Sequence, residues 1–399
     1  MSIFRSPSGS GGAVAAAVEA TPDPRLFHPL GKLNMVRGVE ERRRVTAVTL
    51  AVPSGGHPDA EALVAAVKAA VAGAGGAPAE VRLVAMTARE EVELQARLHE
   101  LGRVAGSGVA AGEETAPGTT SEGRHGAEGP APRSNPFARK GSPTRVVAIG
   151  SGKGGVGKSS VTVNLAVSLA RLGHSVALLD ADVYGFSVPS MLGLSEPPSM
   201  LGDLLLPPVA WGVRCISMGF FVRDDQAVIW RGPMLHKALE QFLVDVHWGS
   251  PEFLLIDLPP GTGDVSLSIA QFVPGAELYV VTTPQPAAER VAQRAAVLAR
   301  QLRLPLRGVI ENMSWFTGED GRRYELFGAG GGEQLARSLG VGLLAQIPFL
   351  PALREGGDLG RPLSAVDPDH EVSRAFAELA GTIVKMGPSR VYRSELSVR

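Results

Sequence analysis

The sequence predicts an α/β protein in which a mostly parallel sheet has helices on both faces and a small N-terminal α/β domain precedes it. Short apolar runs alternate with segments of helical periodicity between residues 143 and 388. These runs are apolar throughout, which is typical of parallel strands buried on both faces. A break in composition at residues 104–142 separates this region from residues 1–103, and 399 residues are enough for two folded units.

The N-terminal region, residues 1–103, reads as a small α/β domain. Residues 14–18 favour a helix, and the β-rich runs at 45–52 and 81–85 predict two strands. Pro58 opens a periodic helix between those strands. With the Asp-Pro-Arg-Leu sequence at 23–26, this order resembles the MIP18-type domain found ahead of Mrp-type ATPases.

One position departs from the MIP18-type pattern. Members of that group often have a cysteine before the second helix, where this chain has Ser-Gly-Gly-His at 54–57. A single histidine in such a sequence is interpreted as a loop residue and not as a metal ligand. We therefore expect no metal site at His57.

Residues 104–142 are rich in Gly, Ala, Ser, Thr, Pro and charged residues and contain few large apolar side chains. Such a segment cannot bury enough surface to offset the entropy lost on ordering. We expect a flexible linker at 104–142, a second domain at 143–388 and a short tail at 389–399.

The second domain is predicted to alternate strands and helices along its whole length. Strands are expected at residues 145–149, 175–179, 253–256, 278–281, 306–310 and 342–346. Helices are expected near residues 158–172, 234–246, 265–272, 286–302, 332–339 and 370–386. Because ligands of such sheets bind at the carboxyl ends of the strands, motifs that follow strands are the candidate site residues.

A glycine-rich loop follows the first of these strands. Residues 152–159 fit G-x-x-x-x-G-K-[ST], the phosphate-binding loop of P-loop NTPases. The glycines let backbone N–H groups surround phosphate oxygens, and the helix N-terminus adds partial positive charge. Lys158 is expected to reach the β- and γ-phosphates, and the Ser159 hydroxyl to bind Mg²⁺. The dinucleotide pattern G-x-G-x-x-G at 150–155 is the alternative, but it lacks the Gly-Lys-Ser continuation.

The sequence therefore predicts an ATP and Mg²⁺ site on a P-loop NTPase sheet. The loop residues expected to contact the nucleotide are Gly152, Lys153, Gly154, Gly155, Val156, Gly157, Lys158, Ser159 and Ser160. Lys153 is a second lysine within the loop, and residues 153–159 resemble the deviant phosphate loop of the MinD/ParA/ArsA/Mrp ATPases. The resemblance implies that Lys153 crosses a homodimer interface to the partner's nucleotide. A solvated lysine that favours anions is the alternative.

Two acidic residues, Asp180 and Asp182, follow the second expected strand. Positions i and i+2 of a strand share a face, which suits a metal shell and the positioning of water. An aspartate that caps the following turn is the alternative. Residues 180–189 resemble switch I of Mrp-type ATPases, with Phe186 in place of the usual proline. The resemblance implies that Asp182 orients the attacking water and that Asp180 supports the Mg²⁺ shell.

Two further strands end in candidate site residues. The apolar run 253–256 ends in Asp257, which has the form of the Walker B acid that holds Mg²⁺, usually through water. Residues 258–264 read Leu-Pro-Pro-Gly-Thr-Gly-Asp and resemble the Mrp-type switch II. Asn312 follows another strand and resembles the adenine-contacting residue of the group, with a turn-forming Asn as the alternative.

The resemblance to Mrp/ApbC-type iron-sulfur cluster carriers covers nearly the whole second domain. It implies an ATPase whose hydrolysis is slow and depends on dimerisation. It also implies that the protein acts as a homodimer and serves apo iron-sulfur client proteins. Two alternatives stay open: a regulatory ATPase that no longer binds a cluster, and a ParA/MinD-like positioning ATPase. The latter needs a basic DNA-binding surface or a C-terminal amphipathic membrane helix, and the tail has no long apolar face.

The cysteine content sets this chain apart from the Mrp-type pattern. Those carriers place Cys-x-x-Cys just after the Asn-Met-Ser segment, whereas residues 315–328 contain no cysteine and Cys215 is the only one in the chain. Cys215 lies in a strand-like run and is interpreted as a buried residue. Iron-sulfur clusters are held by thiolates, so we predict a degenerate cluster site. The acidic residues at 319, 320 and 325 are expected in a solvated hairpin.

Composition sets the remaining limits. The chain is 44% hydrophobic and 20% charged with a net charge of −1, which is typical of a soluble globular protein. This balance gives no general attraction for nucleic acid or anionic membrane. No apolar run approaches the roughly 18 residues of a membrane span. The sequence therefore predicts a cytoplasmic protein with neither nucleic acid nor membrane as a partner.

Overall fold

The structure is a computed structural model, and it divides into two compact units. Unit 1 comprises Met1–Pro143, Ser199–Leu206 and Val244–Ser250, and unit 2 comprises the rest of the chain. The residues that the structure describes are 10–42, 44–104, 135–139, 141–183, 185–221, 232–261, 263–285, 294 and 297–389. The greater part of the predicted linker and tail, and of the helix expected near 286–302, therefore lies outside the described residues.

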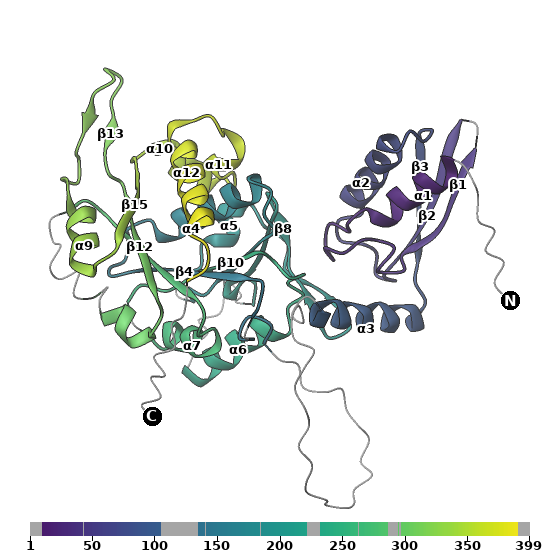
Figure 1. Ribbon diagram of the computed structural model, residues 1–399, viewed down its shortest axis with the longest axis horizontal. Coiled ribbons are helices and arrows are strands. Elements are labelled where there is room, and N and C mark those ends of the chain that lie inside the picture. The colour runs from purple at the N-terminus through teal and green to yellow at the C-terminus, as the bar shows by residue number, and fades with distance from the viewer. Residues whose placement is uncertain are drawn as a thin grey trace, which may run out of the picture. The chain divides into compact units, whose positions relative to one another are not determined.

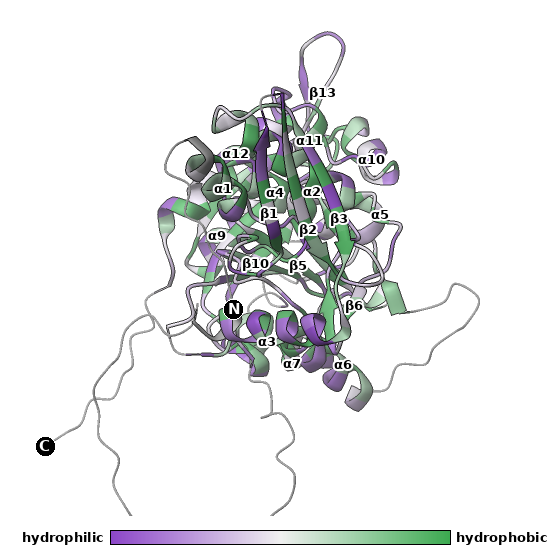
Figure 2. Cartoon of the chain, turned by 90° about the vertical axis from the view of Figure 1, so that its right-hand side faces the viewer, coloured by the Kyte–Doolittle hydropathy of each residue, from purple (hydrophilic) through white to green (hydrophobic). Residues whose placement is uncertain are grey.

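Unit 1 is built on a three-stranded sheet in the order β1-β2-β3 (Figure 1). Its elements are α1 (Ser10–Ala20), β1 (Val36–Arg42), β2 (Val45–Val52), α2 (Ala60–Gly73), β3 (Ala79–Ala85) and α3 (Ala88–Val104). The run predicted at 45–52 is β2 with the same bounds, and it pairs with β1 antiparallel and with β3 parallel. The sequence did not predict β1 or α3. Mixed polar and apolar residues along α3 are visible in Figure 2.

Two segments from the middle of the chain complete the core of unit 1. The hairpin of β6 (Ser199–Leu201) and β7 (Leu204–Leu206) adds three buried leucines to the cluster that contains Leu94 and Leu98 of α3. The buried ring of Phe137 packs edge-on against Trp248 at a centroid distance of 6.1 Å. The structure thus assigns residues 199–206 and 244–250 to unit 1, whereas the sequence analysis placed them within a domain at 143–388. For the hairpin the physical reason is that its leucines pack in the core of unit 1.

Unit 2 contains an eight-stranded sheet in the order β15-β12-β11-β4-β10-β5-β9-β8, and all neighbouring pairs are parallel except β8 with β9. Its strands are β4 (Arg145–Ser151), β5 (Val176–Asp180), β8 (Val209–Ala210), β9 (Val213–Ser217), β10 (Phe253–Asp257), β11 (Glu277–Thr282), β12 (Leu306–Asn312) and β15 (Gly342–Ile347). The mostly parallel sheet predicted from the apolar runs is confirmed. The residues of β4, β5, β10 and β11 are all buried, as continuous apolar runs predict.

Helices cover both faces of this sheet. Figure 1 shows α4 (Lys158–Arg171), α5 (Val188–Leu192) and α12 (Glu371–Met386) on one side, and α6 (Gly232–Val244) and α7 (Asp264–Phe272) on the other. The remaining helices are α9 (Gly331–Leu339), α10 (Pro351–Asp358) and α11 (Leu363–Val366), and η1 (Met218–Phe221) is a 3₁₀ turn. The strands β13 (Phe316–Thr317) and β14 (Arg323–Tyr324) form the predicted hairpin.

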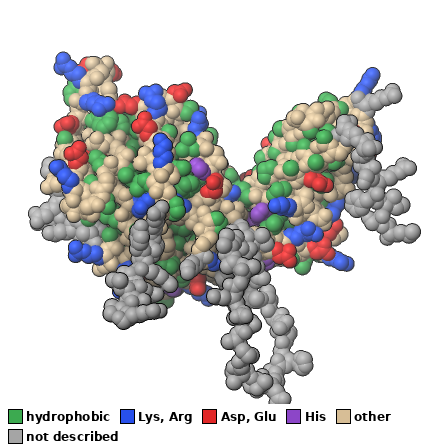
Figure 3. Space-filling view, in the orientation of Figure 1, with side chains coloured by type: hydrophobic (Ala, Val, Ile, Leu, Met, Phe, Trp, Pro, Cys, Tyr) green, Lys and Arg blue, Asp and Glu red, His purple; other side chains and the backbone are tan. Residues whose placement is uncertain are grey.

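The surface carries charges of both signs. Figure 3 shows Lys and Arg interspersed with Asp and Glu over the face in view, in line with a net charge of −1. Among the described residues, no helix combines the length and the apolar character that crossing a membrane requires.

Candidate nucleotide-binding site

The glycine-rich loop connects β4 to α4, which lie against each other in the centre of unit 2 (Figure 1). α4 begins at Lys158, as predicted, and its N-cap Gly157 has a φ of 75°. Gly155 has a φ of 73°, and L side chains rarely adopt this left-handed region. A Cβ atom at Gly157 would lie 2.3 Å from Asn312 Nδ2, so no side chain fits there. Backbone shape and close packing both require glycine at position 157.

Lys158 lies among the carboxylates that the sequence singled out. Its side chain is 6% exposed, and its Nζ is 2.7 Å from Asp257 Oδ2 and 3.6 Å from Asp182 Oδ2. The ammonium group therefore stands at the junction of the loop, the end of β10 and the segment after β5. A cation held at this point attracts the phosphate oxygens of a nucleotide.

Asp257 ends β10 and is 0% exposed. Its Oδ2 accepts a hydrogen bond from Ser159 Oγ at 2.6 Å, which unites the two residues predicted to serve Mg²⁺. Its Oδ1 accepts from Thr162 Oγ1 at 2.8 Å. The sequence reasoning did not identify Thr162, although helical spacing places positions 158 and 162 on one face of α4.

Asp180 is also 0% exposed and lies beside Asp257, because β5 and β10 pair in parallel with these two residues in register. Its carboxylate accepts hydrogen bonds from Ser217 Oγ at 2.9 Å and from the Asp182 backbone N–H at 3.1 Å. The second bond is the turn-capping contact weighed as the alternative for this motif. Desolvation and then the negative charge of Asp257 raise the pKa of Asp180 to about 7.

Asp182 lies beyond the end of β5, so it and Asp180 do not share a face of a continuous strand. The two residues instead meet through the bond between the Asp182 N–H and the Asp180 carboxylate. The Asp182 side chain is 14% exposed and points toward Lys158. Partial burial raises its pKa, while the Lys158 ammonium opposes that change. Of the two acids, Asp182 is the more accessible to water.

Asn312 ends β12 and packs against the phosphate loop. Its Nδ2 donates to the Val156 carbonyl at 2.9 Å, and its Oδ1 is buried and has no partner among the described residues. Next to it, the buried Glu311 carboxylate accepts from the Gly332 N–H at 2.6 Å and fixes the end of β12 against α9. Asn312 Oδ1 is thus an acceptor without a described partner, which is what the adenine contact implied by the resemblance requires.

Lys153 extends from the loop and donates to Gln285 Oε1 at 2.6 Å. Partial burial lowers the pKa of its ammonium. Gln285 follows β11 and was not identified from the sequence. Within one chain, the second lysine of the loop is thus held by a neutral side chain and not by a carboxylate.

The residues present suit a triphosphate with Mg²⁺. The loop supplies Lys158, and the buried hydroxyls of Ser151 and Thr283 are without partners among the described residues. Across those residues, no group of three or more His, Cys, Asp or Glu side chains is arranged to hold a metal by itself. Mg²⁺ is usually bound through one or two carboxylates, water and substrate phosphates, and Asp257 with the Ser159 hydroxyl would supply the protein's share.

The donors of this chain do not suit an iron-sulfur cluster. Cys215 lies in β9 and is 0% exposed, as predicted for a buried residue. Burial, followed by the charges of Asp180 and Asp257, raises the pKa of its thiol well above the usual range. Such a thiol stays protonated, whereas cluster ligation requires an accessible thiolate.

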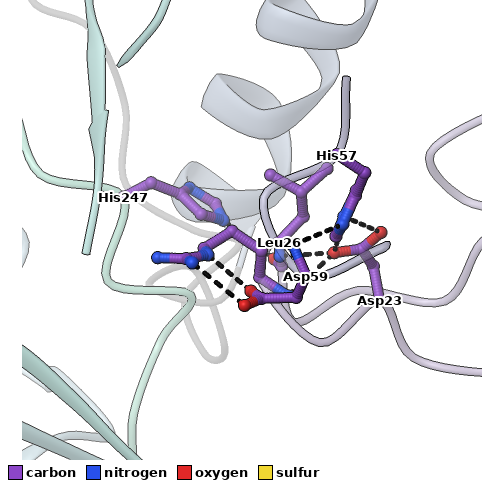
Figure 4. Close-up of polar contacts among 6 residues, drawn as sticks. Asp23, Leu26, His57, Asp59 and His247 are labelled. Atoms are coloured by element: carbon purple, nitrogen blue, oxygen red, sulfur yellow. Dashed lines mark hydrogen bonds and ion pairs between the residues drawn. The ribbon is translucent and has the colours of Figure 1, made fainter. Parts of the chain in front are cut away.

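A second buried polar cluster lies in unit 1, far from the nucleotide motifs in sequence. Figure 4 shows His57 beside Asp23, and its Nε2 is 3.0 Å from Asp23 Oδ2. His57 Nδ1 accepts from the Asp59 N–H at 3.1 Å, so Nε2 carries the proton. The Asp59 carboxylate pairs with Arg25 at 2.6 Å. The predicted loop position of His57 is correct, but its burial and its aspartate partner were not foreseen.

Comparison with known proteins agrees with this geometry. A family model described as ParA, the NUBPL iron-transfer P-loop NTPase, matches residues 142–384. The iron-sulfur cluster carrier protein of Mycobacterium tuberculosis is 42% identical over 376 residues, which cover 92% of this chain and 91% of that protein. That of Bacillus subtilis is 46% identical over 243 residues, 61% of this chain and 68% of that protein.

A solved structure from Archaeoglobus fulgidus, a nucleotide-binding protein in complex with ADP, is 35% identical with a TM-score of 0.48 and covers 54% of this chain and 87% of that one. The mycobacterial alignment extends well beyond the region of the family model and so includes residues of the N-terminal part. The family model matches residues 142–384, and the identity to the mycobacterial carrier extends over 91% of that protein, so the chain belongs to the ParA/NUBPL family of iron-transfer P-loop NTPases.

Proposed function

We propose that this chain is a Mg²⁺-dependent ATPase that works as a homodimeric switch in the delivery of iron-sulfur clusters to apoproteins. The observation that carries the proposal is that Asp257 Oδ2 lies 2.7 Å from Lys158 Nζ and 2.6 Å from Ser159 Oγ at the phosphate loop. The family and the names of its relatives support the link to iron-sulfur clusters.

Phosphoryl transfer asks the protein for positioning and for neutralisation of charge on the phosphate oxygens. The backbone N–H groups of the loop and Lys158 bind the phosphates, and Asn312 Oδ1 accepts from the adenine amino group. Ser159 and Asp257, with Asp180 behind them, hold Mg²⁺. Asp182, the accessible acid beside Lys158, orients the attacking water.

Lys153 is proposed to complete the site of a second copy. Its contact with Gln285 joins the ammonium group to a neutral amide oxygen at the surface, which attracts it less strongly than a phosphate oxygen does. The lysine can therefore leave Gln285 and bind the phosphates of the partner's nucleotide, which attract its ammonium group more strongly. Dimerisation then depends on ATP, and slow hydrolysis releases the two copies.

Within this family role, we infer that the chain regulates or assists transfer and does not hold a cluster on its own cysteines. The observation that favours this role is the hairpin of β13 and β14, which stands where carriers have Cys-x-x-Cys and contains no cysteine. Carriers that bring their own thiolates would supply the cluster, and the apoprotein clients would receive it.

Two lysine substitutions test the ATP switch. Lys158→Ala is expected to abolish nucleotide binding, because the β- and γ-phosphates lose their principal cation. Lys153→Ala is expected to leave ATP binding near the parental level while weakening ATP-dependent dimerisation and hydrolysis. Binding is measured by titration calorimetry, association by sedimentation with and without ATP, and hydrolysis by phosphate release.

An exposed lysine outside the loop, Lys237 on α6, provides the matched control. Lys237→Ala should behave like the parent in all three measurements. An equal loss of binding and hydrolysis in Lys153→Ala would contradict the role across the dimer. Parental hydrolysis in Lys158→Ala would contradict the assignment of the site.

A further inference from the structure

The two oxygens of Asp257 have different partners. Oδ2 lies 2.6 Å from Ser159 Oγ and 2.7 Å from Lys158 Nζ, both in the phosphate loop motif. Oδ1 instead accepts a hydrogen bond from Thr162 Oγ1 at 2.8 Å. The carboxylate therefore presents one oxygen to the loop and the other to the first turns of α4.

Burial makes the hydrogen bond from Thr162 to Asp257 important for the orientation of the carboxylate. Thr162 and Asp257 are both 0% exposed, so water does not replace a lost donor at Oδ1. Thr162 Oγ1 is also 2.9 Å from the Lys158 carbonyl of its own helix, but the bond to the Asp257 carboxylate is the shorter of the two at 2.8 Å. The χ2 torsion of an aspartate has a broad energy minimum, so a fixed donor is needed to hold its plane.

We propose that Thr162 is a positioning residue for the Mg²⁺ site: its hydroxyl holds Asp257 Oδ1 and thereby directs Oδ2 toward the metal shell. In the nucleotide complex proposed above, the Ser159 hydroxyl serves the metal and the Lys158 ammonium serves the phosphates. Among the described residues, Thr162 is then the hydrogen-bond donor to Asp257 that does not also bind the metal or the nucleotide. The inference rests on the proposed ATP and Mg²⁺ site.

The test separates metal affinity from nucleotide affinity in the full-length chain. Thr162→Val keeps the branched shape and removes the hydroxyl. The affinity for a fluorescent ADP analogue is first measured in EDTA, without free Mg²⁺. Mg²⁺ is then titrated into the complex, and the midpoint is the concentration that gives half of the metal-dependent change in fluorescence. This midpoint is expected to rise about 10–100-fold in Thr162→Val, the usual effect of losing a group that orients a metal ligand, while affinity in EDTA is unchanged.

Two further variants make the readout specific. Thr162→Ser retains the hydroxyl and should restore the parental Mg²⁺ midpoint. Ser168→Ala removes a hydroxyl from the same helix at a position that is 3% exposed and has no described contact with Asp257, and it should also keep the parental midpoint. If Thr162→Val does not fold, Thr162→Ala makes the same test with a smaller side chain.

The outcomes distinguish this inference from the function on which it rests. A parental Mg²⁺ midpoint in the variant without the hydroxyl would overturn the positioning role. So would an equal loss of affinity with and without Mg²⁺, or the same midpoint shift in Ser168→Ala, since each indicates a general structural effect. If the parent itself binds no ADP, the proposed function fails instead.

Discussion

The acids at the carboxyl ends of β5 and β10 owe their chemistry to burial. Asp180 and Asp257 are both 0% exposed, and parallel pairing places them in register. Two adjacent carboxylates cannot both ionise at low cost, so one of them keeps its proton to a higher pH. Desolvation, followed by the charge of Asp257, raises the pKa of Asp180 to about 7, although Ser217 and Lys158 oppose the change.

This shift predicts a pH dependence for the nucleotide-free protein. Between its unfolded pKa of 3.8 and about 7, Asp180 is protonated in the folded state and ionised in the unfolded state. The unfolded state then binds fewer protons, so stability falls as pH rises through this window, by at most about 4 kcal/mol from this group. Below pH 3.8 and above pH 7, Asp180 does not contribute to the change of stability with pH.

Asp180→Asn tests this dependence because the amide has nearly the shape of the protonated acid. Urea unfolding of parent and variant between pH 4 and pH 8, without nucleotide, should give a flatter profile for Asp180→Asn. The advantage of the variant should be greatest above pH 7. Parallel profiles would mean that Asp180 does not titrate in this window.

At the scale of elements, the start of α2 is fixed by polar contacts between residues far apart in sequence. The Asp23 carboxylate accepts from the N–H groups of Arg25 and Leu26 and from His57, 34 residues away. Asp59 precedes α2, but its carboxylate makes no cap and pairs with Arg25 instead. His247, from the segment 244–250, donates from Nε2 to the Leu26 carbonyl at 2.9 Å (Figure 4). These contacts join the loop after α1 to the loop before α2.

Removing His57 should therefore destabilise unit 1. His57→Ala leaves the buried Asp23 carboxylate without its side-chain partner, and we expect a loss of about 2–4 kcal/mol. Chemical denaturation monitored by circular dichroism measures the change. His174 pairs with Glu252 where both side chains are partly exposed, 25% and 57%, and serves as the matched control.

His174→Ala should cost no more than about 1 kcal/mol, because water screens an exposed pair. An equal effect of the two substitutions would show that the burial of the His57 pair contributes nothing. Nucleotide binding should be unchanged in both variants, because neither histidine lies in the phosphate loop.

For the whole molecule, the number of thiols limits what the chain can carry. One chain has only Cys215, so a homodimer has two cysteines, both in the interior strand β9. The hairpin of β13 and β14 carries a cation–π contact in place of thiols: the Arg323 guanidinium carbon lies 4.2 Å from the centroid of the Trp315 ring. Four thiolates at a dimer interface are therefore not available from this chain.

Anaerobic reconstitution of the full-length protein with iron and sulfide tests this limit. We expect neither stoichiometric iron nor a stable visible absorbance after desalting, in the parent or in Cys215→Ala. Metal analysis and absorption spectra provide the measurement. A stable, stoichiometric cluster in the parent would overturn the prediction, and its persistence in Cys215→Ala would identify ligands other than this cysteine.

Features that depend on neighbours along the chain could be predicted from the amino-acid sequence. The phosphate loop is such a feature, because glycine conformation, the helix start at Lys158 and the Ser159 hydroxyl all follow within one short segment. The apolar runs determined β4, β5, β10 and β11, since only strands covered on both faces tolerate such runs. The buried position of Cys215 followed from the same local pattern.

Contacts that join distant segments could not be predicted in this way, because they depend on how the whole chain packs. The bond from Thr162 to Asp257 spans 95 residues, and the bond from His57 to Asp23 spans 34. The hairpin of β6 and β7 reads as part of the second domain, yet its leucines complete the core of unit 1. Periodicity specifies which face of an element is apolar, but not which distant element covers it. Packing of the whole chain makes that choice, because it must bury every apolar face and give each buried polar group a partner.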